Sequence, residues 1–405
     1  MTSKQIHFYF LNVGHLFDHL FVLIYATVAA LALVTDWSMS YGDLVFYATS
    51  GSVALGLFTL PAGWIADKWS REGMMAAFFF GIGGASILTA FAQSPLQISA
   101  GLALIGAFAA IYHPVGLALV VEGRSNTGIP LAINGVWGNV GVGAAALLTG
   151  LLIDIAGWRA AFWMPGAVCM TLGVGYVWYL AKREQTGAAD GKSAPSKSAS
   201  SPEPVLAQNV LVHIFAVVLI STAIGGLIFQ STTFALPKVF EERLSDFAGS
   251  ATMVGFYAFI VFCIGSIAQI IVGVLADRYS IRLVFAGVAI LQIVFLGLME
   301  SMSGAFALIV AVIAMMAAFG QIPLNDLLVG RIAAGSWRSR LFAIRYMVTF
   351  SVAAATLPFV GWLHNQWGFG ALFVVLASSA VFTLLTVVTL PRAGSEAVPE
   401  PPPAE

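Results

Sequence analysis

The chain has 405 residues, of which 59% are hydrophobic and only 9% are charged, and its formal net charge is −1. A soluble globular domain carries roughly 25% charged residues, so most of the surface of this chain does not face water. The composition excludes soluble enzymes, secreted disulfide scaffolds and disordered chains, and it predicts a polytopic membrane protein. No basic block is dense enough to neutralise a phosphate backbone, so we expect no nucleic-acid partner.

Twelve membrane-spanning helices are predicted from the apolar runs that lie between turn and charge signals. A helix needs about 20 apolar residues to cross the hydrocarbon core, so twelve crossings use about 240 residues. The expected fold class is an all-α membrane protein with two bundles of six helices. In chain order the predicted spans are 8–34, 44–65, 73–92, 98–121, 130–153, 160–181, 209–236, 249–275, 283–301, 305–329, 339–362 and 370–390.

Two segments outside these spans have the composition of flexible chain. Residues 182–208 are rich in Ser, Ala, Pro, Gly and charge, and residues 391–405 are rich in Pro. Such segments cannot bury enough apolar surface to order themselves. We therefore expect an N-terminal bundle over 1–181, a flexible cytoplasmic linker over 182–208, a C-terminal bundle over 209–390 and a disordered cytoplasmic tail over 391–405.

The basic residues indicate the orientation, because Lys and Arg accumulate in cytoplasmic loops. With the N-terminus inside, fourteen of the 18 Lys and Arg residues fall on the cytoplasmic side, three fall in outer loops, and Arg345 lies within a span. Moving the prediction by one helix would invert this asymmetry. We expect a multi-pass protein of the inner (plasma) membrane, with both termini and the linker in the cytoplasm.

Ionisable residues in the first and fourth spans are the first candidates for function. His15, Asp18 and His19 are spaced i, i+3 and i+4, so they share one helix face, and His113 lies in the cytoplasmic half of span four. An ionisable group at membrane depth costs several kcal/mol unless it is paired or faces water. Burial and neighbouring charge act on Asp18 in opposite directions, and their balance can bring its titration near physiological pH. These four residues are predicted to couple transport to protons, with a static hydrogen-bonded cluster or a transition-metal site as alternatives.

The second half offers different chemistry at membrane depth. Span ten contains Gln321, Asn325 and Asp326, and span eleven contains Arg345. A guanidinium in low dielectric suits a carboxylate or phosphate, so Arg345 either pairs with Asp326 or anchors an anionic substrate. Both interpretations stay open. The residues expected to contact the substrate are Arg345, Gln321, Asn325, Asn134, Asn139 and Tyr112.

The two halves of the chain repeat short sequence patterns. Gly63 to Lys68 follows span two, and the similar Gly273 to Arg278 follows span eight at an offset of 210 residues. Gly150 to Phe162 aligns with Gly361 to Phe373 at an offset of 211. Two six-helix halves in parallel orientation are typical of a transporter that rocks about a central site.

The loops after spans two and eight resemble the Gly-x-x-x-Asp-Arg/Lys signature loop of the major facilitator superfamily. The resemblance implies twelve helices in two pseudo-symmetric bundles, and a cytoplasmic lock of charged contacts that holds one conformation. An alternative for Asp67 is that it only caps the following helix. The residues that match the lock motif are Gly63, Asp67, Lys68, Arg71, Gly273, Asp277, Arg278 and Arg282.

Three short patterns in the first half resemble fosmidomycin-resistance-type permeases. They are His15-Leu-Phe-Asp18, Tyr112-His113-Pro114 and Gly138-Asn139-Val-Gly141. This resemblance implies drug efflux. However, span four has no Arg and span five has no Pro after its glycines, although drug–proton antiporters commonly carry both. A permease for organic anions, either carboxylates or phosphates, is therefore the alternative.

The predicted function is secondary active transport of a small organic solute by alternating access, coupled to protons. The chain has no Gly-x-x-x-x-Gly-Lys-Ser/Thr phosphate loop, which disfavours ATP-driven transport by this chain alone. We expect a monomer in the lipid bilayer that is not an enzyme and has no cofactor or resident metal. The competing hypotheses are a channel, an intramembrane enzyme, which is disfavoured because no His-Glu-x-x-His motif occurs, a non-transporting sensor and a transition-metal transporter that uses the span-one histidines.

Overall fold

Every regular element in the described part of the chain is a helix. The computed structural model describes residues 2–124, 127–185, 208–332 and 338–391. Eleven continuous helices in these ranges have the length and apolar character of membrane spans. The all-α membrane fold class predicted from the sequence is confirmed.

The first half contributes six spans, of which the first and the fourth contain short π-helical turns. Its elements are α1 (Ser3–Val28), η1 (Ala29–Leu33), α2 (Val34–Asp36), α3 (Tyr41–Lys68), α4 (Arg71–Thr89), α5 (Pro95–Ala109), η2 (Tyr112–Gly116), α6 (Leu117–Val121), α7 (Gly128–Ala156) and α8 (Trp158–Gln185). The first span therefore runs through α1, η1 and α2, and the fourth through α5, η2 and α6. Of the predicted linker, 186–207 lies outside the described residues, as does the predicted tail beyond 391.

The second half contributes the other six spans, although two of them form one continuous element. Its helices are α9 (Gln208–Arg243), α10 (Ala251–Arg278), α11 (Ile281–Leu298), α12 (Gly304–Ile332) and α13 (Arg338–Val387). Within α13, Gly368 has φ 73° and ψ −173°, a non-helical conformation that favours glycine. This residue divides α13 into two crossings, so the eleven continuous helices provide the twelve spans that were predicted.

Serine side chains begin several of the spans. Ser40, Ser70, Ser94 and Ser250 each accept a hydrogen bond from a backbone N–H in the first turn of α3, α4, α5 and α10. A cap of this kind satisfies an N–H that has no partner within the helix. Because capped turns extend past the apolar core of a span, α3, α4 and α5 begin two or three residues before the predicted apolar runs.

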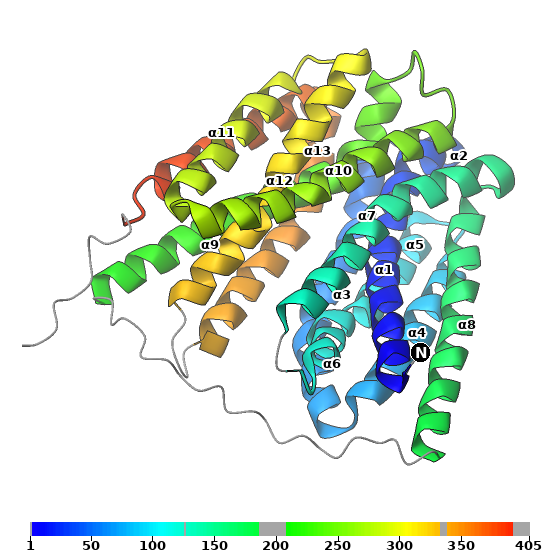
Figure 1. Cartoon of the computed structure of the whole chain (residues 1–405). Helices are drawn as coiled ribbons and strands as arrows, with labels where there is room; N and C mark the ends of the chain where they lie inside the picture. Colours follow the sequence, from blue (N-terminus) through cyan, green and yellow to red (C-terminus); the bar gives the residue numbers. More distant parts are fainter. Residues whose placement is uncertain (1, 125–126, 186–207, 333–337, 392–405) are drawn as a thin grey trace, which may run out of the picture.

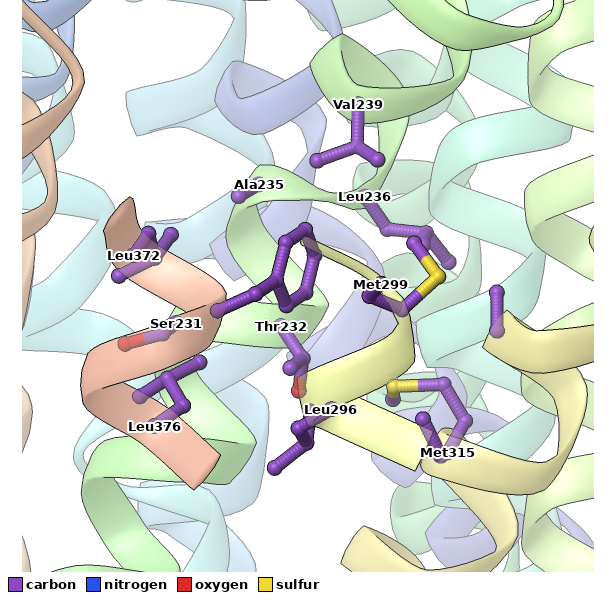
Figure 2. A pocket seen from close by; sticks show the side chains of 13 residues that line it. Ser231, Thr232, Ala235, Leu236, Val239, Leu296, Met299, Met315, Leu372 and Leu376 are labelled. Carbon is purple, nitrogen blue, oxygen red and sulfur yellow. The ribbon is translucent and has the colours of Figure 1, made fainter. Parts of the chain in front are cut away.

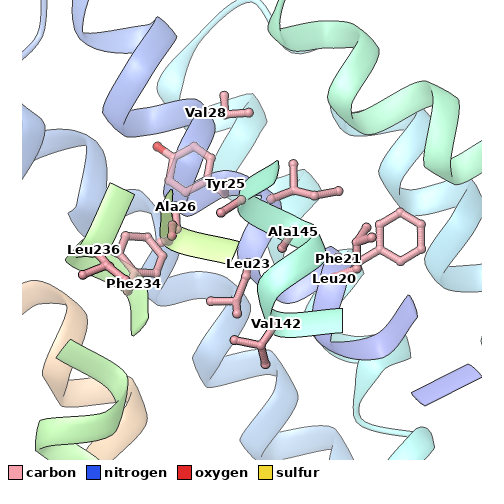
Figure 3. Close-up of a cluster of buried hydrophobic side chains, with 14 of the residues drawn as sticks. Leu20, Phe21, Leu23, Tyr25, Ala26, Val28, Val142, Ala145, Phe234 and Leu236 are labelled. Atoms are coloured by element: carbon pink, nitrogen blue, oxygen red, sulfur yellow. The ribbon is translucent and has the colours of Figure 1, made fainter. Parts of the chain in front are cut away.

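The two halves lie side by side, with α1–α8 coloured blue to green and α9–α13 coloured green to red in Figure 1. They meet along two pairs of helices, α7 with α10 and α3 with α13. Buried apolar side chains join the halves near the middle of this interface. Figure 3 shows Leu20 and Tyr25 of α1, Val142 and Ala145 of α7 and Phe234 of α9 in one buried cluster. In lipid such contacts stabilise the association by close packing rather than by exclusion of water.

An apolar cavity lies inside the second half, between α9, α12, α13 and the end of α11 (Figure 2). Its empty volume is about 330 Å³, and its walls include Met299, Met315, Phe373 and Ser231. All the residues that line it come from one half of the chain. The cavity therefore does not open between the two bundles.

A carboxylate at the end of α7 caps the first turn of α10 across the interface. Asp154 accepts hydrogen bonds from the backbone N–H groups of Ala251 at 3.2 Å and Thr252 at 2.7 Å, and from the Thr252 hydroxyl at 2.5 Å. One turn earlier, a Cβ on Gly150 would lie only 2.2 Å from the Ala251 carbonyl oxygen. The absence of a side chain at Gly150 thus allows the backbones to approach closely enough for the cap to form.

The second interface repeats this arrangement between α13 and α3. The Asn365 side-chain oxygen accepts a hydrogen bond from the Gly42 backbone N–H at 3.1 Å, and its amide nitrogen donates to Asp43 at 3.2 Å. A Cβ on Gly361 would lie 2.5 Å from the Gly42 carbonyl oxygen. An amide three residues before Gly368, where α13 is divided, therefore caps the first turn of α3, beside a contact between two glycines.

Asp154 and Asn365, called the twin caps below, occupy equivalent positions in the sequence repeat. Each stands four residues after the glycine that opens the aligned segments Gly150 to Phe162 and Gly361 to Phe373. Both caps lie at the ends of α3 and α10 that are farthest from the two signature loops. The repeat therefore corresponds to two equivalent contacts that hold the two halves together at one end of the molecule.

Asp154→Ala is expected to shift the halves toward a state in which α7 and α10 are separated. Loss of a helix cap costs about 1 kcal/mol, which corresponds to about a fivefold change in the conformational equilibrium. The shift is measured as a longer spin-label distance between cysteines placed at Ile155 and Gly249, after replacement of the two native cysteines. Asp246→Ala, at an exposed carboxylate near the start of α10, is the control. An Asp154→Ala distance distribution identical to that of the control contradicts the role of the cap.

Candidate functional site

The structure brings together the four ionisable residues predicted in spans one and four. His15, Asp18 and His19 lie on α1, and His113 lies on η2. The Nε2 atoms of His15 and His19 are 3.1 Å apart, and His113 Nε2 lies 3.5 Å from an Asp18 carboxylate oxygen. The His113 ring centroid lies 5.5 Å from that of His15 and 5.6 Å from that of His19. We call these four residues the histidine cluster.

Pro114 accounts for the local shape that presents His113. Proline has no backbone N–H, so it cannot complete a regular α-helical ladder. The fourth span is accordingly interrupted after Ala109 and continues as the π-helical turn η2, which contains both His113 and Pro114. A π-helical turn changes the direction in which side chains leave a helix, and such turns are frequent at functional sites.

His15 is fixed in one orientation and one tautomer. Its Nδ1 lies 2.8 Å from the Asn134 carbonyl oxygen. A carbonyl only accepts hydrogen bonds, so Nδ1 carries the hydrogen, and in the neutral ring Nε2 has a free lone pair. Tyr112 stacks on the ring at 4.7 Å, and a Cβ on Gly138 would lie 2.7 Å from it. The Nε2 atom of His15 therefore faces His19 as an acceptor.

One carboxylate oxygen of Asp18 is buried without a hydrogen-bond partner among the described residues. The Asp18 side chain is 3% exposed, and the oxygen without a partner is Oδ1. The neighbouring His113 side chain is 39% exposed, so the cluster can be reached from the surface. A buried carboxyl with one free oxygen can accept a proton or a ligand without losing an existing hydrogen bond.

Two of the predicted substrate-binding residues, Asn134 and Tyr112, are fully buried in the first half. Asn134 donates to Asn12 and to the Tyr112 hydroxyl, both at 2.9 Å, and Tyr112 donates to the Leu11 carbonyl oxygen at 2.7 Å. These bonds hold α7 and η2 against α1. Asn12 was not singled out from the sequence, although it stands one turn before His15 on the same helix. Contact of Asn134 and Tyr112 with a substrate stays a prediction.

Gln321 and Asn325 form a corresponding buried network in the second half. Gln321 donates to the Ser221 carbonyl oxygen at 2.8 Å and accepts from Gln292 at 2.7 Å, while the Ser221 hydroxyl donates to Asn325 at 2.7 Å. The network ties α9, α11 and α12 together. Asn139 instead lies at the interface between the halves, where its amide donates to Gln269 of α10 at 3.4 Å.

Arg345 forms an ion pair with Asp326, which is one of the two interpretations that the sequence left open. The Arg345 side chain is 13% exposed and that of Asp326 is 55% exposed. The Arg345 Nε atom has no partner among the described residues. The guanidinium is thus held by a carboxylate that itself remains accessible.

A pocket lies between the halves, where the sequence predicts a central site, but none of the predicted substrate-binding residues lines it. It has an empty volume of about 400 Å³, and its lining comes from α1, α3 and α5 of the first half and from α9 and α13 of the second. Its walls combine aromatic and aliphatic side chains with Ser52, Gln230 and Tyr25. Apolar and aromatic residues are ordinary in membrane helices, so no sequence signal separated the pocket from the general packing.

Comparison with known proteins agrees with the repeated architecture. The profile of the Major Facilitator Superfamily matches residues 11–245. The chain belongs to the Major Facilitator Superfamily. It is therefore a membrane transporter by family.

Curated proteins similar to this chain include a transporter and a resistance protein. A gallate transporter of Pseudomonas putida is 24% identical over 399 residues, which cover 91% of this chain and 83% of that protein. A puromycin resistance protein of Streptomyces alboniger is 32% identical over 157 residues. That match covers 37% of this chain and only 31% of the relative.

Solved transporter structures show the same fold. A bacterial homolog of the human lysosomal transporter Spinster, in an inward-facing and unoccupied conformation, has a TM-score of 0.71 and 12% identity. The alignment covers 96% of this chain and 94% of the homolog. A peptide transporter in complex with sulfate has a TM-score of 0.72 and 13% identity, over 96% of this chain and 98% of the other.

The superfamily signature loops lie at the end of the molecule opposite to the twin caps. In the first loop Arg71 pairs with Asp67 at 2.9 Å and with Glu122 at 3.7 Å. A Cβ on Gly63 would lie 3.4 Å from Pro114, so this glycine packs beside η2. These contacts stay within the first half.

The second signature loop is as exposed as the first. Asp277 and Arg278 are exposed, as is Lys68 of the first loop, and no neighbour lies within 4 Å of a Cβ placed on Gly273. Arg282 donates to the Leu390 carbonyl oxygen of its own half at 3.1 Å. The described contacts of the lock residues therefore do not join the two halves in this conformation.

Proposed function

We propose that the chain is a secondary active transporter that moves a small organic solute by alternating access, coupled to protons. The observation that carries the proposal is the buried carboxyl of Asp18, which has one free oxygen and lies 3.5 Å from the partly exposed His113. In this mechanism Asp18 takes up and releases the proton, and His113 connects it with the aqueous passage. His15 and His19 complete the polar environment of Asp18 at membrane depth.

The arrangement of the two halves supports alternation between two states. The twin caps close one end of the interface, and the lock residues at the other end bond only within their own halves. Transport then consists of opening the first end while the lock residues of the two signature loops come together at the second. Each state is stabilised by contacts that the other state lacks, which a two-state cycle requires.

The proposal includes the orientation of the chain in the membrane and the membrane in which it lies. The distribution of Lys and Arg supports cytoplasmic termini and signature loops in an inner (plasma) membrane, so we propose that the end at which the lock residues bond within their own halves faces the cytoplasm. The twin caps then lie at the outer face. Each half completes its own bundle, and we propose a monomer as the transporting unit.

The relatives and the pocket between the halves support a chemical class for the solute. The pocket between the halves is lined mainly by apolar and aromatic side chains, with Ser52 and Gln230 as polar contacts, which suits a small planar solute. The gallate transporter matches nearly the whole chain, which supports an aromatic acid as substrate. The puromycin resistance protein supports drug efflux, as does the resemblance to fosmidomycin-resistance-type permeases. However, the match to the puromycin resistance protein covers only 37% of this chain.

Arg345 favours an organic anion as the solute. It lies on α13, the helix that also contributes Leu357 to the pocket, about 18 Å along the helix from that residue toward the signature loops. A solute carboxylate can replace the accessible Asp326 as the partner of the guanidinium, with no change in the number of ion pairs. In this proposal Arg345 receives the anion on the side of the pocket that faces the signature loops.

Two substitutions separate the anion anchor from a purely structural ion pair. Arg345→Gln is expected to raise KM for an aromatic carboxylate at least about tenfold, because a charge-assisted hydrogen bond contributes about 1.5–3 kcal/mol. Asp326→Asn leaves the guanidinium in place and removes its competitor, so KM is expected to stay equal or fall. Initial rates of uptake into proteoliposomes provide both values. Equal increases in KM for the two variants would show that only the pair matters.

The proton coupling is tested in the same proteoliposomes with a pH-sensitive dye in the lumen. An inward gradient of an aromatic carboxylate is expected to change the internal pH, and protein-free vesicles provide the baseline. Saturable solute uptake without any change in internal pH contradicts the proposed coupling and leaves facilitated diffusion.

A further inference from the structure

We propose that His15, His19 and His113 form a binding site for one divalent transition-metal ion such as Zn²⁺. Each imidazole offers one ligand nitrogen, and the three ligand atoms all lie within 4.8 Å of one another. Among the described residues this is the one group of three or more His, Cys, Asp or Glu side chains that meets this condition. Imidazole nitrogen is a preferred ligand of Zn²⁺, Cu²⁺ and Ni²⁺.

His15 is already arranged as a metal-bound histidine is. Its Nδ1 hydrogen is bound by the Asn134 carbonyl oxygen at 2.8 Å, which leaves the Nε2 lone pair free. Histidines that ligate metals almost always donate their other ring hydrogen in this way, because the bond fixes the tautomer and the ring orientation. Stacking on Tyr112 at 4.7 Å holds the same ring on its face.

The distances require only small movements of two side chains. In a tetrahedral site with Zn–N bonds of about 2.0–2.1 Å, two ligand nitrogens lie about 3.3–3.4 Å apart. The Nε2 atoms of His15 and His19 are already 3.1 Å apart. The hydrogen that His19 shares with His15 must move to its Nδ1 atom by exchange with water. The partly exposed His113, on the π-helical turn, is the side chain with room to close the remaining separation.

Asp18 supplies the negative charge that such a site needs. Its carboxylate lies 3.5 Å from His113 Nε2, and its other oxygen has no partner among the described residues. A carboxylate behind a metal-bound histidine orients the ring and strengthens it as a ligand. Three imidazoles leave a fourth tetrahedral position, which water or the free Asp18 oxygen can occupy. A divalent ion would thus find three neutral ligands and one nearby charge.

The inference rests on the positions of the imidazoles and does not depend on the proposed solute. It does have a consequence for transport, because the ion would occupy the residues that we propose as the proton path. A bound ion is therefore expected to inhibit gradient-driven transport. The ion acts here as an inhibitor rather than as cargo, since the described residues that line the pocket between the halves include no His, Cys, Asp or Glu side chain that could bind it.

The test uses the full-length chain without a polyhistidine tag, purified in detergent and titrated with Zn²⁺ by calorimetry and with Co²⁺ by visible absorption. Saturable binding of one ion per chain is expected, with a tetrahedral Co²⁺ spectrum. His19→Asn and His113→Asn should each weaken binding at least about tenfold. His213→Asn is the matched control, because His213 is exposed and bonds to Thr389 far from the cluster.

Three outcomes would overturn the site. They are no saturable binding to the wild-type chain, unchanged affinity in His19→Asn and His113→Asn, or an equal loss of affinity in His213→Asn. The melting temperature without metal shows whether each variant is folded. If His19→Asn does not fold, His113→Asn still tests the site, because it replaces a partly exposed side chain. Failure of metal binding leaves solute-driven proton movement intact, so this result and the transport proposal are judged separately.

Discussion

Asp18→Asn is expected to abolish accumulation of the solute against its gradient while leaving exchange of solute across the membrane intact. A pH difference of one unit supplies about 1.4 kcal/mol per proton, so one coupled proton can drive about tenfold accumulation in the wild type. The amide of Asn fills the space of the buried carboxyl but cannot take up a proton. The variant should therefore equilibrate the solute without concentrating it.

The measurement compares pH-driven accumulation with counterflow of labelled solute in the same proteoliposomes. Asp36→Asn is the control, because Asp36 ends the first span at an exposed position away from the histidine cluster. Full pH-driven accumulation by Asp18→Asn would remove this residue from the mechanism. Loss of both accumulation and counterflow, with an unchanged melting temperature, would assign Asp18 a purely structural role.

Gly150→Ala is expected to slow transport at least about tenfold. The added Cβ would lie 2.2 Å from the Ala251 carbonyl oxygen, so α7 and α10 cannot approach as they do here. Overpacking of a tight contact costs about 1–3 kcal/mol, and the affected contact exists only when this end is closed. The closed state becomes rare, and each transport cycle must pass through it.

A matched substitution on the same helix provides the control for this effect. No atom lies within 4 Å of a Cβ placed on Gly135, so Gly135→Ala tests the general effect of alanine in α7. The repeat predicts that Gly361→Ala, at the equivalent contact with Gly42, behaves like Gly150→Ala. Initial transport rates decide the question, and a Gly150→Ala rate equal to that of Gly135→Ala would show that the close approach is dispensable.

The sequence was sufficient for the spans because burial in lipid requires long apolar runs. Helix ends were less accurate, since caps such as Ser40 lie outside those runs. The repeat at Gly150 and Gly361 was visible in the sequence. That these segments form equivalent contacts between the two halves could not be predicted from it. Hydropathy describes the faces of each helix, whereas the partner of Asp154 is a backbone N–H in the other half.

The polar residues of the site show the same limit. Helical spacing placed His15, Asp18 and His19 on one face, and the approach of His113 agrees with that expectation. The sequence left two partners open for Arg345, and the structure shows the pair with Asp326. Asn134 and Gln321 were identified as polar residues at membrane depth. Their side chains form buried networks within each half, which spacing along one helix cannot show.

The π-helical turn η2 makes the histidine cluster depend on the number of residues in the fourth span. Successive residues of a regular helix are rotated by about 100° around its axis. A chain with one residue fewer between Ala109 and His113 would bring His113 one helical position earlier, so its side chain would be turned by about this angle away from α1. A single-residue deletion would therefore dismantle the cluster while leaving all four of its side chains in the sequence.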